Sequence, residues 1–294
     1  MLWKRIRLTL DMIKFEHSIF ALPFALTGAA LAFREVHLPT RVVLTKLLWI
    51  LIAMVATRSA AMAFNRILDA KIDAKNPRTS TRHIPTGQIT TRFAWVFTVI
   101  SGAVLLVAAR ALNPLCLALA PLALAIVCFY SFTKRFTSLS HLVLGFSLGI
   151  APTAAWIAIT GSLDPRILWL TAAVTFWTAG FDVIYSCQDR EFDVREGLFS
   201  LPNRYGIAGA LWIARWFHAL MIGCLLALVW SFQLGWLSLA GVAAVVALLI
   251  YEHSLVRAND LSRVNAAFFT VNGYVSMLFF VFWAADIYLL KLPL

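Results

Sequence analysis

Long apolar segments recur along the whole of this chain, and they limit what it can fold into. Each reaches about 18 residues or more, which is enough for a helix to cross roughly 30 Å of hydrocarbon. Of the 294 residues, 61% are hydrophobic and 13% are charged, whereas a soluble domain carries roughly 25% charged residues. A soluble core cannot bury that much apolar surface, so the sequence predicts an all-α, polytopic membrane protein.

Polar clusters and breaks at proline or glycine divide the apolar segments into nine predicted transmembrane helices. They cover residues 12–33, 44–69, 92–112, 114–132, 138–161, 166–190, 207–231, 235–256 and 264–290. An odd number of spans puts the two termini on opposite sides of the membrane.

The distribution of lysine and arginine sets the predicted orientation. These residues concentrate at the amino terminus and in the loops after the second, fourth, sixth and eighth predicted helices. Because positive residues stay on the cytoplasmic side, we expect a location in the cell inner (plasma) membrane, with the amino terminus and those loops in the cytoplasm. The same asymmetry accounts for the net charge of +11, so no nucleic-acid partner is expected. The four cysteines lack CxxC spacing, which argues against a disulfide framework or a zinc site.

Six of the 14 acidic residues fall in two short clusters, and the first lies at the end of the second predicted helix. Asn65, Asp69 and Asp73 are spaced four residues apart. At 3.6 residues per turn, this spacing puts the three side chains in one stripe along a helix. Carboxylates are costly in a membrane and usually mark a functional site.

The second cluster lies at the end of the sixth predicted helix and contains Asp182, Asp189, Glu191 and Asp193. Asp69 is as far from Asp189 in sequence as Asp73 is from Asp193. This shared register predicts two related halves, about 12–132 and 138–256, followed by the ninth helix at 264–290. The whole of 1–294 is expected to form a single transmembrane domain.

The chemistry of the two clusters suits Mg²⁺ bound to a diphosphate. Mg²⁺ is a hard cation that usually takes one or two carboxylates together with phosphate oxygens and water. Two facing stripes would hold such ions around one diphosphate and neutralise its charge as it leaves. Cations near the same membrane surface would complete the diphosphate site: Arg66, Arg78, Lys134 and Arg135.

Two other interpretations of the acids are open at this point. The acids could only solvate helix ends and balance the basic loops. They could also line the pathway of a cation-coupled membrane transporter. A transporter needs acids near the middle of the bilayer, whereas these lie at predicted cytoplasmic helix ends.

The two motifs resemble those of the UbiA superfamily of intramembrane prenyltransferases. NxxxDxxxD matches Asn65, Asp69 and Asp73, and DxxYxxxDxxxD matches Asp182, Tyr185, Asp189 and Asp193. The likeness extends from the first helix to at least Gly206, and it includes three further segments. They are Arg78-Thr79, Arg82-His83-Ile84-Pro85-Thr86-Gly87 and Tyr130-Ser131-Phe132-Thr133-Lys134-Arg135.

The resemblance implies nine helices around a central cavity and Mg²⁺-dependent transfer of a polyprenyl group from an allylic diphosphate to a hydroxylated aromatic acid. Asn65, Asp69, Asp73, Asp189 and Asp193 would bind the metal. The catalytic group would comprise Asp182, which orients the acceptor or takes up its proton, with Tyr185 and Arg58. Tyr130, one turn before Lys134, would join the cations named above at the diphosphate.

The implied acceptor is 4-hydroxybenzoate, for lipid quinone (ubiquinone) biosynthesis, but one departure leaves it open. Phe199 stands where hydroxybenzoate enzymes often have a lysine. The segments Lys14-Phe15-Glu16-His17 and Gly197-Leu198-Phe199-Ser200-Leu201-Pro202 are closer to a branch linked to menaquinone, whose acceptor would be a dihydroxynaphthoate. Membrane lipid and the two substrates are the expected partners, with no obligate protein partner.

Glu252 and His253 close the eighth predicted helix, where a solvated cytoplasmic end is expected.

Overall fold

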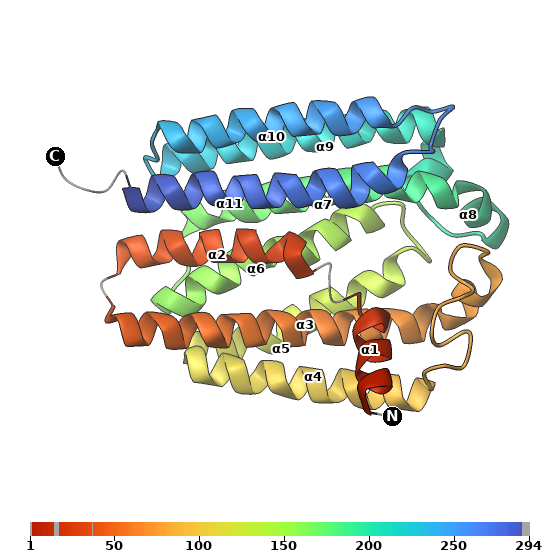
Figure 1. Cartoon of the computed structure of the whole chain (residues 1–294), viewed down its shortest axis with the longest axis horizontal. Coiled ribbons are helices and arrows are strands. Elements are labelled where there is room, and N and C mark those ends of the chain that lie inside the picture. The colour runs from red at the N-terminus through yellow and green to blue at the C-terminus, as the bar shows by residue number, and fades with distance from the viewer. Residues whose placement is uncertain (1, 15–17, 37, 290–294) are drawn as a thin grey trace. The chain divides into compact units, whose positions relative to one another are not determined.

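The structure is a computed structural model that describes residues 2–14, 18–36 and 38–289 (Figure 1). Its described part is built from helices, and eight helical spans are long and apolar enough to cross a membrane. The long helices are α3 (Thr40–Lys75), α4 (Thr91–Leu112), α5 (Pro114–Thr133), α6 (Ser140–Thr160), α7 (Leu168–Ser186), α9 (Leu201–Ser231), α10 (Trp236–Leu255) and α11 (Asn272–Leu289). The predicted all-α, polytopic membrane class is confirmed.

The shorter elements refine the predicted boundaries. They are α1 (Leu2–Met12), α2 (Ser18–Glu35), α8 (Arg190–Glu196), the 3₁₀ turns η2 (Pro165–Ile167) and η3 (Cys187–Asp189), and the π-helix η4 (Ala266–Val271). The helix predicted over 12–33 corresponds to α2, because α1 ends at Met12 and α2 starts at Ser18. Glu16 and His17, from the resembling segment at 14–17, lie outside the described residues. Because eight described helical spans are long and apolar enough to cross a membrane, the predicted count of nine spans is approximate.

The chain divides into two compact units. The first comprises Met1–Ser18 and Thr40–Phe132, and the second comprises Ile19–Pro39 and Thr133–Leu294. This division assigns α2 to the second unit, so it differs from a simple cut into 12–132 and 138–256. The relation of the two predicted halves, and the single domain over 1–294, stay predictions.

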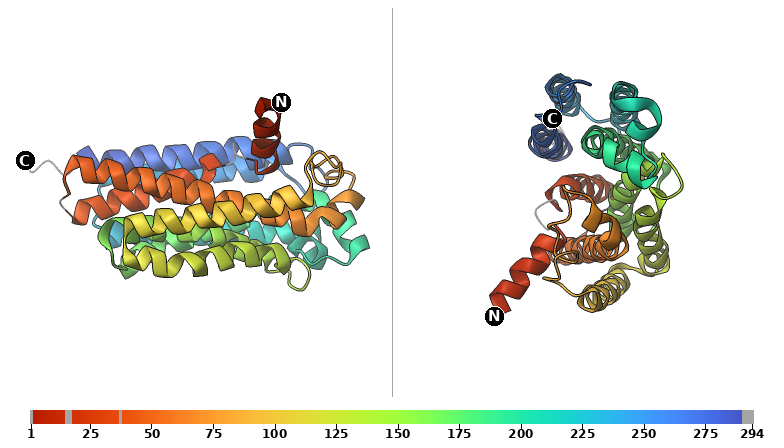
Figure 2. Two further views of the ribbon diagram at one scale, coloured as in Figure 1. Left: turned by 90° about the horizontal axis from the view of Figure 1, so that it is seen from below. Right: turned by 90° about the vertical axis from the view of Figure 1, so that its right-hand side faces the viewer.

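The first unit contains α1, α3, α4 and α5. Small buried residues join the three long helices, with Ala56 on α3, Ala109 on α4 and Ala120 on α5 in one apolar cluster. Such residues let helix backbones approach closely in a membrane. The short α1 runs across the direction of α3 (Figure 2). It is held there by Met12, which packs in a second cluster against Ala63 of α3.

The second unit contains α2, α6, α7, α8, α9, α10 and α11. Helix α7 packs against both α6 and α9, and α10 packs against α11. A Cβ atom added at Gly28 of α2 would collide with the backbone of Pro152 in α6, so only glycine allows these two helices to lie so close. In the core, the ring of Phe24 stacks on that of Phe279 at a centroid separation of 4.6 Å and contacts the tilted ring of Trp177 at 4.9 Å.

A buried polar network crosses the second unit and corrects one prediction. Glu252 has an exposed fraction of 0%, so it is not part of a solvated helix end. Asn272 donates from Nδ2 to Glu252 Oε1 at 2.8 Å and accepts at Oδ1 from Trp177 Nε1 at 2.7 Å. His218 Nδ1 lies 3.0 Å from His253 Nε2. Partners on neighbouring helices make this burial possible, because a buried polar group is costly unless it is hydrogen-bonded.

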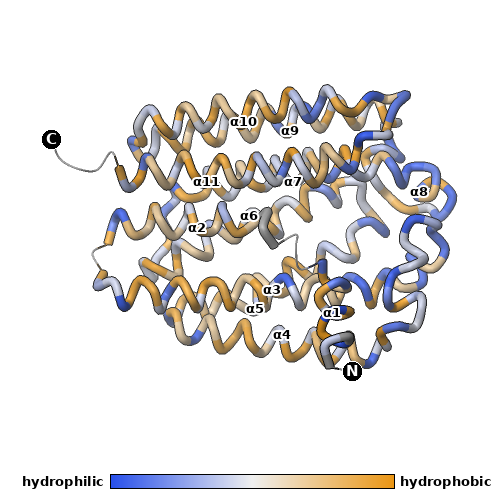
Figure 3. Tube along the Cα trace, in the orientation of Figure 1, coloured by the Kyte–Doolittle hydropathy of each residue, from blue (hydrophilic) through white to orange (hydrophobic). Residues whose placement is uncertain are grey.

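Hydropathy along the chain distinguishes the spans from the polar segments that carry the motifs (Figure 3). The long helices are mainly hydrophobic, while the loop after α3 and the region around α8 are hydrophilic. Both acid clusters identified from the sequence lie next to these hydrophilic segments, at the ends of α3 and α7.

Candidate functional site

The first acid cluster lies on one uninterrupted helix, as predicted. Helix α3 continues to Lys75 and so carries Asn65, Asp69 and Asp73 through its last turns. Asn65 donates from Nδ2 to Asp69 Oδ2 at 3.1 Å and to Ser131 Oγ at 3.4 Å. Asp69 and Asp73 are only 2% and 4% exposed. The two carboxylates of the stripe are therefore buried, and the stripe does not form a solvated helix end.

Arg82, in the loop after α3, contacts the last acid of this stripe. Its Nη1 atom donates to both carboxylate oxygens of Asp73, at 2.7 Å each. The loop is also tied to the helix end by Thr79, whose hydroxyl donates to the Asp73 carbonyl at 3.2 Å. The resemblance drew attention to the segment around Arg82, but sequence spacing gave it no role at the acids.

The loop residue next to Arg82 is also partly buried. Burial lowers the pKa of the His83 imidazole; the Asp11 carboxylate opposes this shift, and the positive charges of Arg66 and Lys14 add to it. A lowered pKa favours the neutral imidazole at neutral pH. His83 therefore adds little positive charge beside Arg82.

Three predicted cations of the first unit differ in their surroundings. Arg66 is buried, and its Nε donates to the Met12 carbonyl at 3.2 Å. Arg58 Nη2 donates to the Lys14 carbonyl at 3.4 Å. Both arginines thus contact the segment at the end of α1. Arg78 is exposed in the loop after α3. Their assignment to diphosphate or acceptor stays a prediction.

The remaining predicted diphosphate residues lie around the end of α5. Tyr130 is half-buried in the last turn of α5 in the first unit. Lys134 and Arg135 follow α5, in the second unit, and both are half-buried. The Lys134 carbonyl accepts a hydrogen bond from the Phe199 amide at 2.8 Å. This contact brings the segment after α5 beside the segment after α8.

The second acid cluster does not lie on one regular helix, and this corrects the predicted helix over 166–190. Helix α7 ends at Ser186, the 3₁₀ turn η3 spans Cys187–Asp189, and α8 begins at Arg190. Ser186 Oγ and Cys187 Sγ both donate to the Val183 carbonyl, at 2.8 and 3.4 Å. Side chains that bond nearby carbonyls compete with the helical ladder, which gives a local reason for the tighter turn. Asp189 closes this turn, and Asp193 lies on α8.

Asp182 and Asp193 each have a hydrogen-bond partner that sequence reasoning missed. His141, at the start of α6, places Nδ1 2.7 Å from Asp182 Oδ2. The hydroxyl of Ser200 hydrogen-bonds to Asp193. Histidine 41 residues away from an aspartate carries no pattern signal, because only the fold brings the two together.

Tyr185, one turn beyond Asp182 on α7, belongs to an aromatic cluster. Its ring centroid lies 4.1 Å from that of Phe268 and 6.1 Å from that of Phe269, both on the π-helix η4. Phe181 contacts Phe268 edge-on at 5.2 Å. π-helical turns often mark functional sites, and this one presents two aromatic rings to the tyrosine of the second motif.

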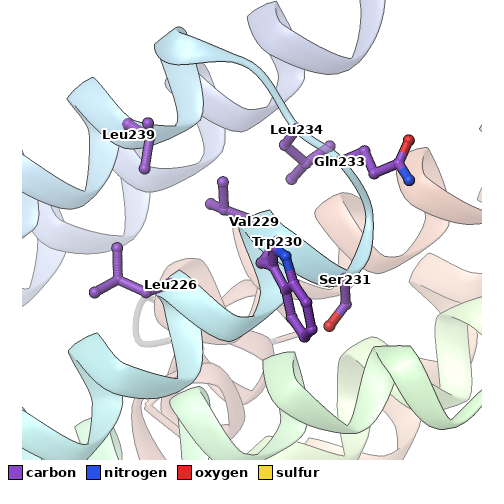
Figure 4. Close-up of a pocket in the computed structure, with 7 residues that line it drawn as sticks. All are labelled: Leu226, Val229, Trp230, Ser231, Gln233, Leu234 and Leu239. Carbon is purple, nitrogen blue, oxygen red and sulfur yellow. The ribbon is translucent and has the colours of Figure 1, made fainter.

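A surface pocket in the second unit is chemically unsuited to a charged substrate. It has a volume of about 570 Å³ and lies where α9 turns into α10 (Figure 4). Its lining contains no charged side chain: Leu226, Val229, Trp230, Ser231, Gln233, Leu234 and Leu239. We therefore assign the candidate site to the acid clusters.

Comparisons with known proteins extend over most of the chain. The sequence pattern of the UbiA prenyltransferase family matches residues 21–285. A 4-hydroxybenzoate octaprenyltransferase from Vibrio vulnificus is 31% identical over 246 residues, which cover 81% of this chain and 84% of the relative. One from Methylobacillus flagellatus is 31% identical over 237 residues, covering 79% and 78%.

Solved structures of UbiA homologs have a fold similar to that of this chain. The apo structure of a UbiA homolog from Aeropyrum pernix is 33% identical, with a TM-score of 0.83 over 92% of this chain and 98% of that one. A UbiA homolog from Archaeoglobus fulgidus, bound to GPP and Mg²⁺, is 20% identical. It aligns with a TM-score of 0.75 over 95% of this chain and 99% of that one.

Proposed function

The chain belongs to the UbiA prenyltransferase family, and we propose that it transfers a polyprenyl group from an allylic diphosphate to 4-hydroxybenzoate, using Mg²⁺. The likeness to 4-hydroxybenzoate octaprenyltransferases supports this acceptor, because it covers 84% of the length of one such relative. The observation that carries the proposal is the pair of acid motifs at helix ends, with Asp69 and Asp73 almost fully buried. A buried carboxylate needs a cation or hydrogen bonds as a partner.

The donor atoms suit Mg²⁺ bound together with a diphosphate. Asn65, Asp69, Asp73, Asp189 and Asp193 offer only hard oxygen ligands. Within the described part of the chain, no three His, Cys, Asp or Glu side chains are grouped to hold a metal ion by themselves. Mg²⁺ commonly takes only one or two carboxylates and completes its shell with phosphate oxygens and water. When bound, it would neutralise the negative charge that develops on the leaving diphosphate.

We assign the steps of the reaction as follows. The allylic C–O bond breaks, and diphosphate leaves with the electron pair while Lys134, Arg135, Arg66 and Arg78 bind its oxygens. A ring carbon of the acceptor forms the new C–C bond, and the ring then loses its proton. Asp182 orients the acceptor through its hydroxyl or takes up a proton, and Tyr185, one turn further along α7, completes the proposed catalytic group. Side chains held in fixed positions accelerate such a reaction by orienting the substrates and by stabilising the charge that develops in the transition state.

A dihydroxynaphthoate is the second candidate acceptor. Phe199, where many hydroxybenzoate enzymes have lysine, lies in the segment after α8 and has an exposed fraction of 48%. An aromatic ring there would favour a larger aromatic acceptor over a phosphate contact. Transport of a cation has less support, because Asp69 and Asp73 lie in the last two turns of α3, which ends at Lys75.

A direct assay tests the proposed function. Purified protein in detergent with Mg²⁺, a polyprenyl diphosphate and 4-hydroxybenzoate is expected to release diphosphate and form prenylated acid, identified by mass spectrometry. Removal of Mg²⁺ with EDTA is expected to abolish both products, and added Mg²⁺ to restore them. A panel containing dihydroxynaphthoates, homogentisate and glycerol phosphates would rank the acceptors. Turnover only with a member other than 4-hydroxybenzoate would overturn the proposed acceptor, and no turnover with any of them would overturn the prenyl transfer.

We also propose that the chain lies in the inner (plasma) membrane with its amino terminus in the cytoplasm. The support is the positive-inside distribution of lysine and arginine. Gln88, exposed in the loop after α3, and Ser162, exposed in the loop after α6, would then lie on opposite sides. In intact cells, a membrane-impermeant maleimide is expected to label Ser162→Cys but to label Gln88→Cys only after lysis. The opposite labelling pattern would reverse the orientation.

A further inference from the structure

His141 links three elements of the second unit at the second acid motif. It occupies the first turn of α6, and its side chain is 4% exposed. Its Nδ1 atom lies 2.7 Å from Asp182 Oδ2 on α7. Its other ring nitrogen, Nε2, accepts a hydrogen bond from the backbone amide of Leu201, the first residue of α9, at 3.3 Å. Both ring nitrogens therefore have a protein partner.

These two contacts determine where the imidazole carries its proton. A backbone amide only donates, so Nε2 must be unprotonated to accept from Leu201. The proton of the neutral ring is then on Nδ1, from which it is donated to the Asp182 carboxylate. A hydrogen bond to an ionised acceptor is shorter and stronger than a neutral one, in agreement with the 2.7 Å distance. With Nε2 occupied by an amide, His141 cannot pass a proton onward, which excludes a proton-shuttle role.

The contact leaves half of the Asp182 carboxylate available. Its side chain is 20% exposed, five times the 4% exposure of His141. In the described part of the chain, Oδ2 is bonded by His141, and no hydrogen bond to Oδ1 is present. We propose that His141 is a positioning residue: it fixes Asp182 through Oδ2, so that Oδ1 can accept the hydrogen bond of the hydroxyl group on the aromatic acceptor. This inference rests on the proposed function.

A purely structural role for His141 would be to cap α9. That helix already has a cap, because Ser200 Oγ accepts from the Asn203 amide at 3.3 Å. Ser200 also hydrogen-bonds to the proposed metal ligand Asp193. Disruption of this helix start would therefore disturb the prenyl diphosphate site. A positioning role predicts a different outcome, in which only the acceptor is affected.

The experiment compares His141→Leu with His141→Gln in the purified full chain. Leucine removes both hydrogen bonds, whereas the glutamine amide can donate to Asp182 and accept from Leu201. We expect His141→Leu to lower kcat/KM for 4-hydroxybenzoate by a factor on the order of 10 to 10², as for other residues that orient a functional group. The KM for the prenyl diphosphate and the inhibition constant of benzoate, which lacks the hydroxyl, should change by no more than about twofold. His141→Gln should recover at least about a third of the wild-type kcat/KM.

The outcomes separate this inference from the proposed function. Wild-type-like kinetics in a folded His141→Leu variant would overturn the inference alone. An equal loss of prenyl diphosphate affinity would assign His141 a structural role and also overturn it. If His141→Leu fails to fold, the glutamine variant decides, since a loss of more than about tenfold in that folded protein contradicts the proposal. Absence of turnover in the wild-type chain itself would instead overturn the proposed function, and with it the acceptor named here.

Discussion

Asp69→Ala and Asp189→Ala are each expected to lower kcat by a factor on the order of 10³, the scale of losing a principal electrostatic contact to the leaving group. Asp69 lies in the stripe at the end of α3 and is 2% exposed. Asp189 closes the 3₁₀ turn η3 between α7 and α8. Each substitution removes an oxygen ligand for Mg²⁺, so the charge of the departing diphosphate would no longer be neutralised. Diphosphate release measured at saturating substrates gives the size of the loss.

Glu191→Ala is the matched control for these two variants. Glu191 is an exposed acid that lies between Asp189 and Asp193 in sequence. The Glu191→Ala substitution removes one negative charge from the segment that contains Asp189, but it removes no proposed metal ligand. The activity of this variant should therefore remain close to the wild-type value. All three variants should insert into the membrane fraction and elute as single species in detergent, because Asp69→Ala deletes a buried charge without opening a large cavity. Unchanged kcat in Asp69→Ala and Asp189→Ala would end the assignment of these acids to the metal.

The stripe on α3 was predictable because it depends on local geometry alone. Residues four apart on a helix share a face whatever surrounds them, and α3 runs without a break through Asn65, Asp69 and Asp73. The all-α membrane class was predictable for a similar reason, since span length and apolar composition set it directly. Both predictions require only that the segment be helical.

The features that sequence could not give are one irregular local turn and two contacts between distant segments. The 3₁₀ turn before Asp189 needs side chains to bond the Val183 carbonyl, and no residue there forbids a regular helix. The partner of Asp182 is 41 residues away. The burial of Glu252 depends on Asn272 from another helix. Fold alone brings these groups together.

Arg82→Ala is expected to lower kcat/KM for the prenyl diphosphate by a factor on the order of 10². Arg82 donates to both carboxylate oxygens of Asp73 at 2.7 Å, and the side chains are 27% and 5% exposed. Loss of a residue that orients a metal ligand costs about 10- to 100-fold in activity in other proteins. We expect the upper end of that range, because Arg82 contacts both carboxylate oxygens of Asp73. Arg82→Lys should recover only part of the activity, because lysine cannot reproduce the planar arginine geometry.

Two opposing effects decide the sign of this prediction, and a titration with Mg²⁺ distinguishes them. Loss of a positive charge next to Asp73 would by itself strengthen cation binding, whereas loss of the contact releases both the carboxylate and the loop that Thr79 ties to the helix end. Orientation should dominate, because a misplaced ligand weakens transition-state stabilisation at every Mg²⁺ concentration. Arg92→Ala, which removes an exposed arginine at the start of α4, controls for the change in surface charge. Equal kinetics in Arg82→Ala and Arg92→Ala, or full recovery of Arg82→Ala by excess Mg²⁺, would show that the ion pair does not position Asp73.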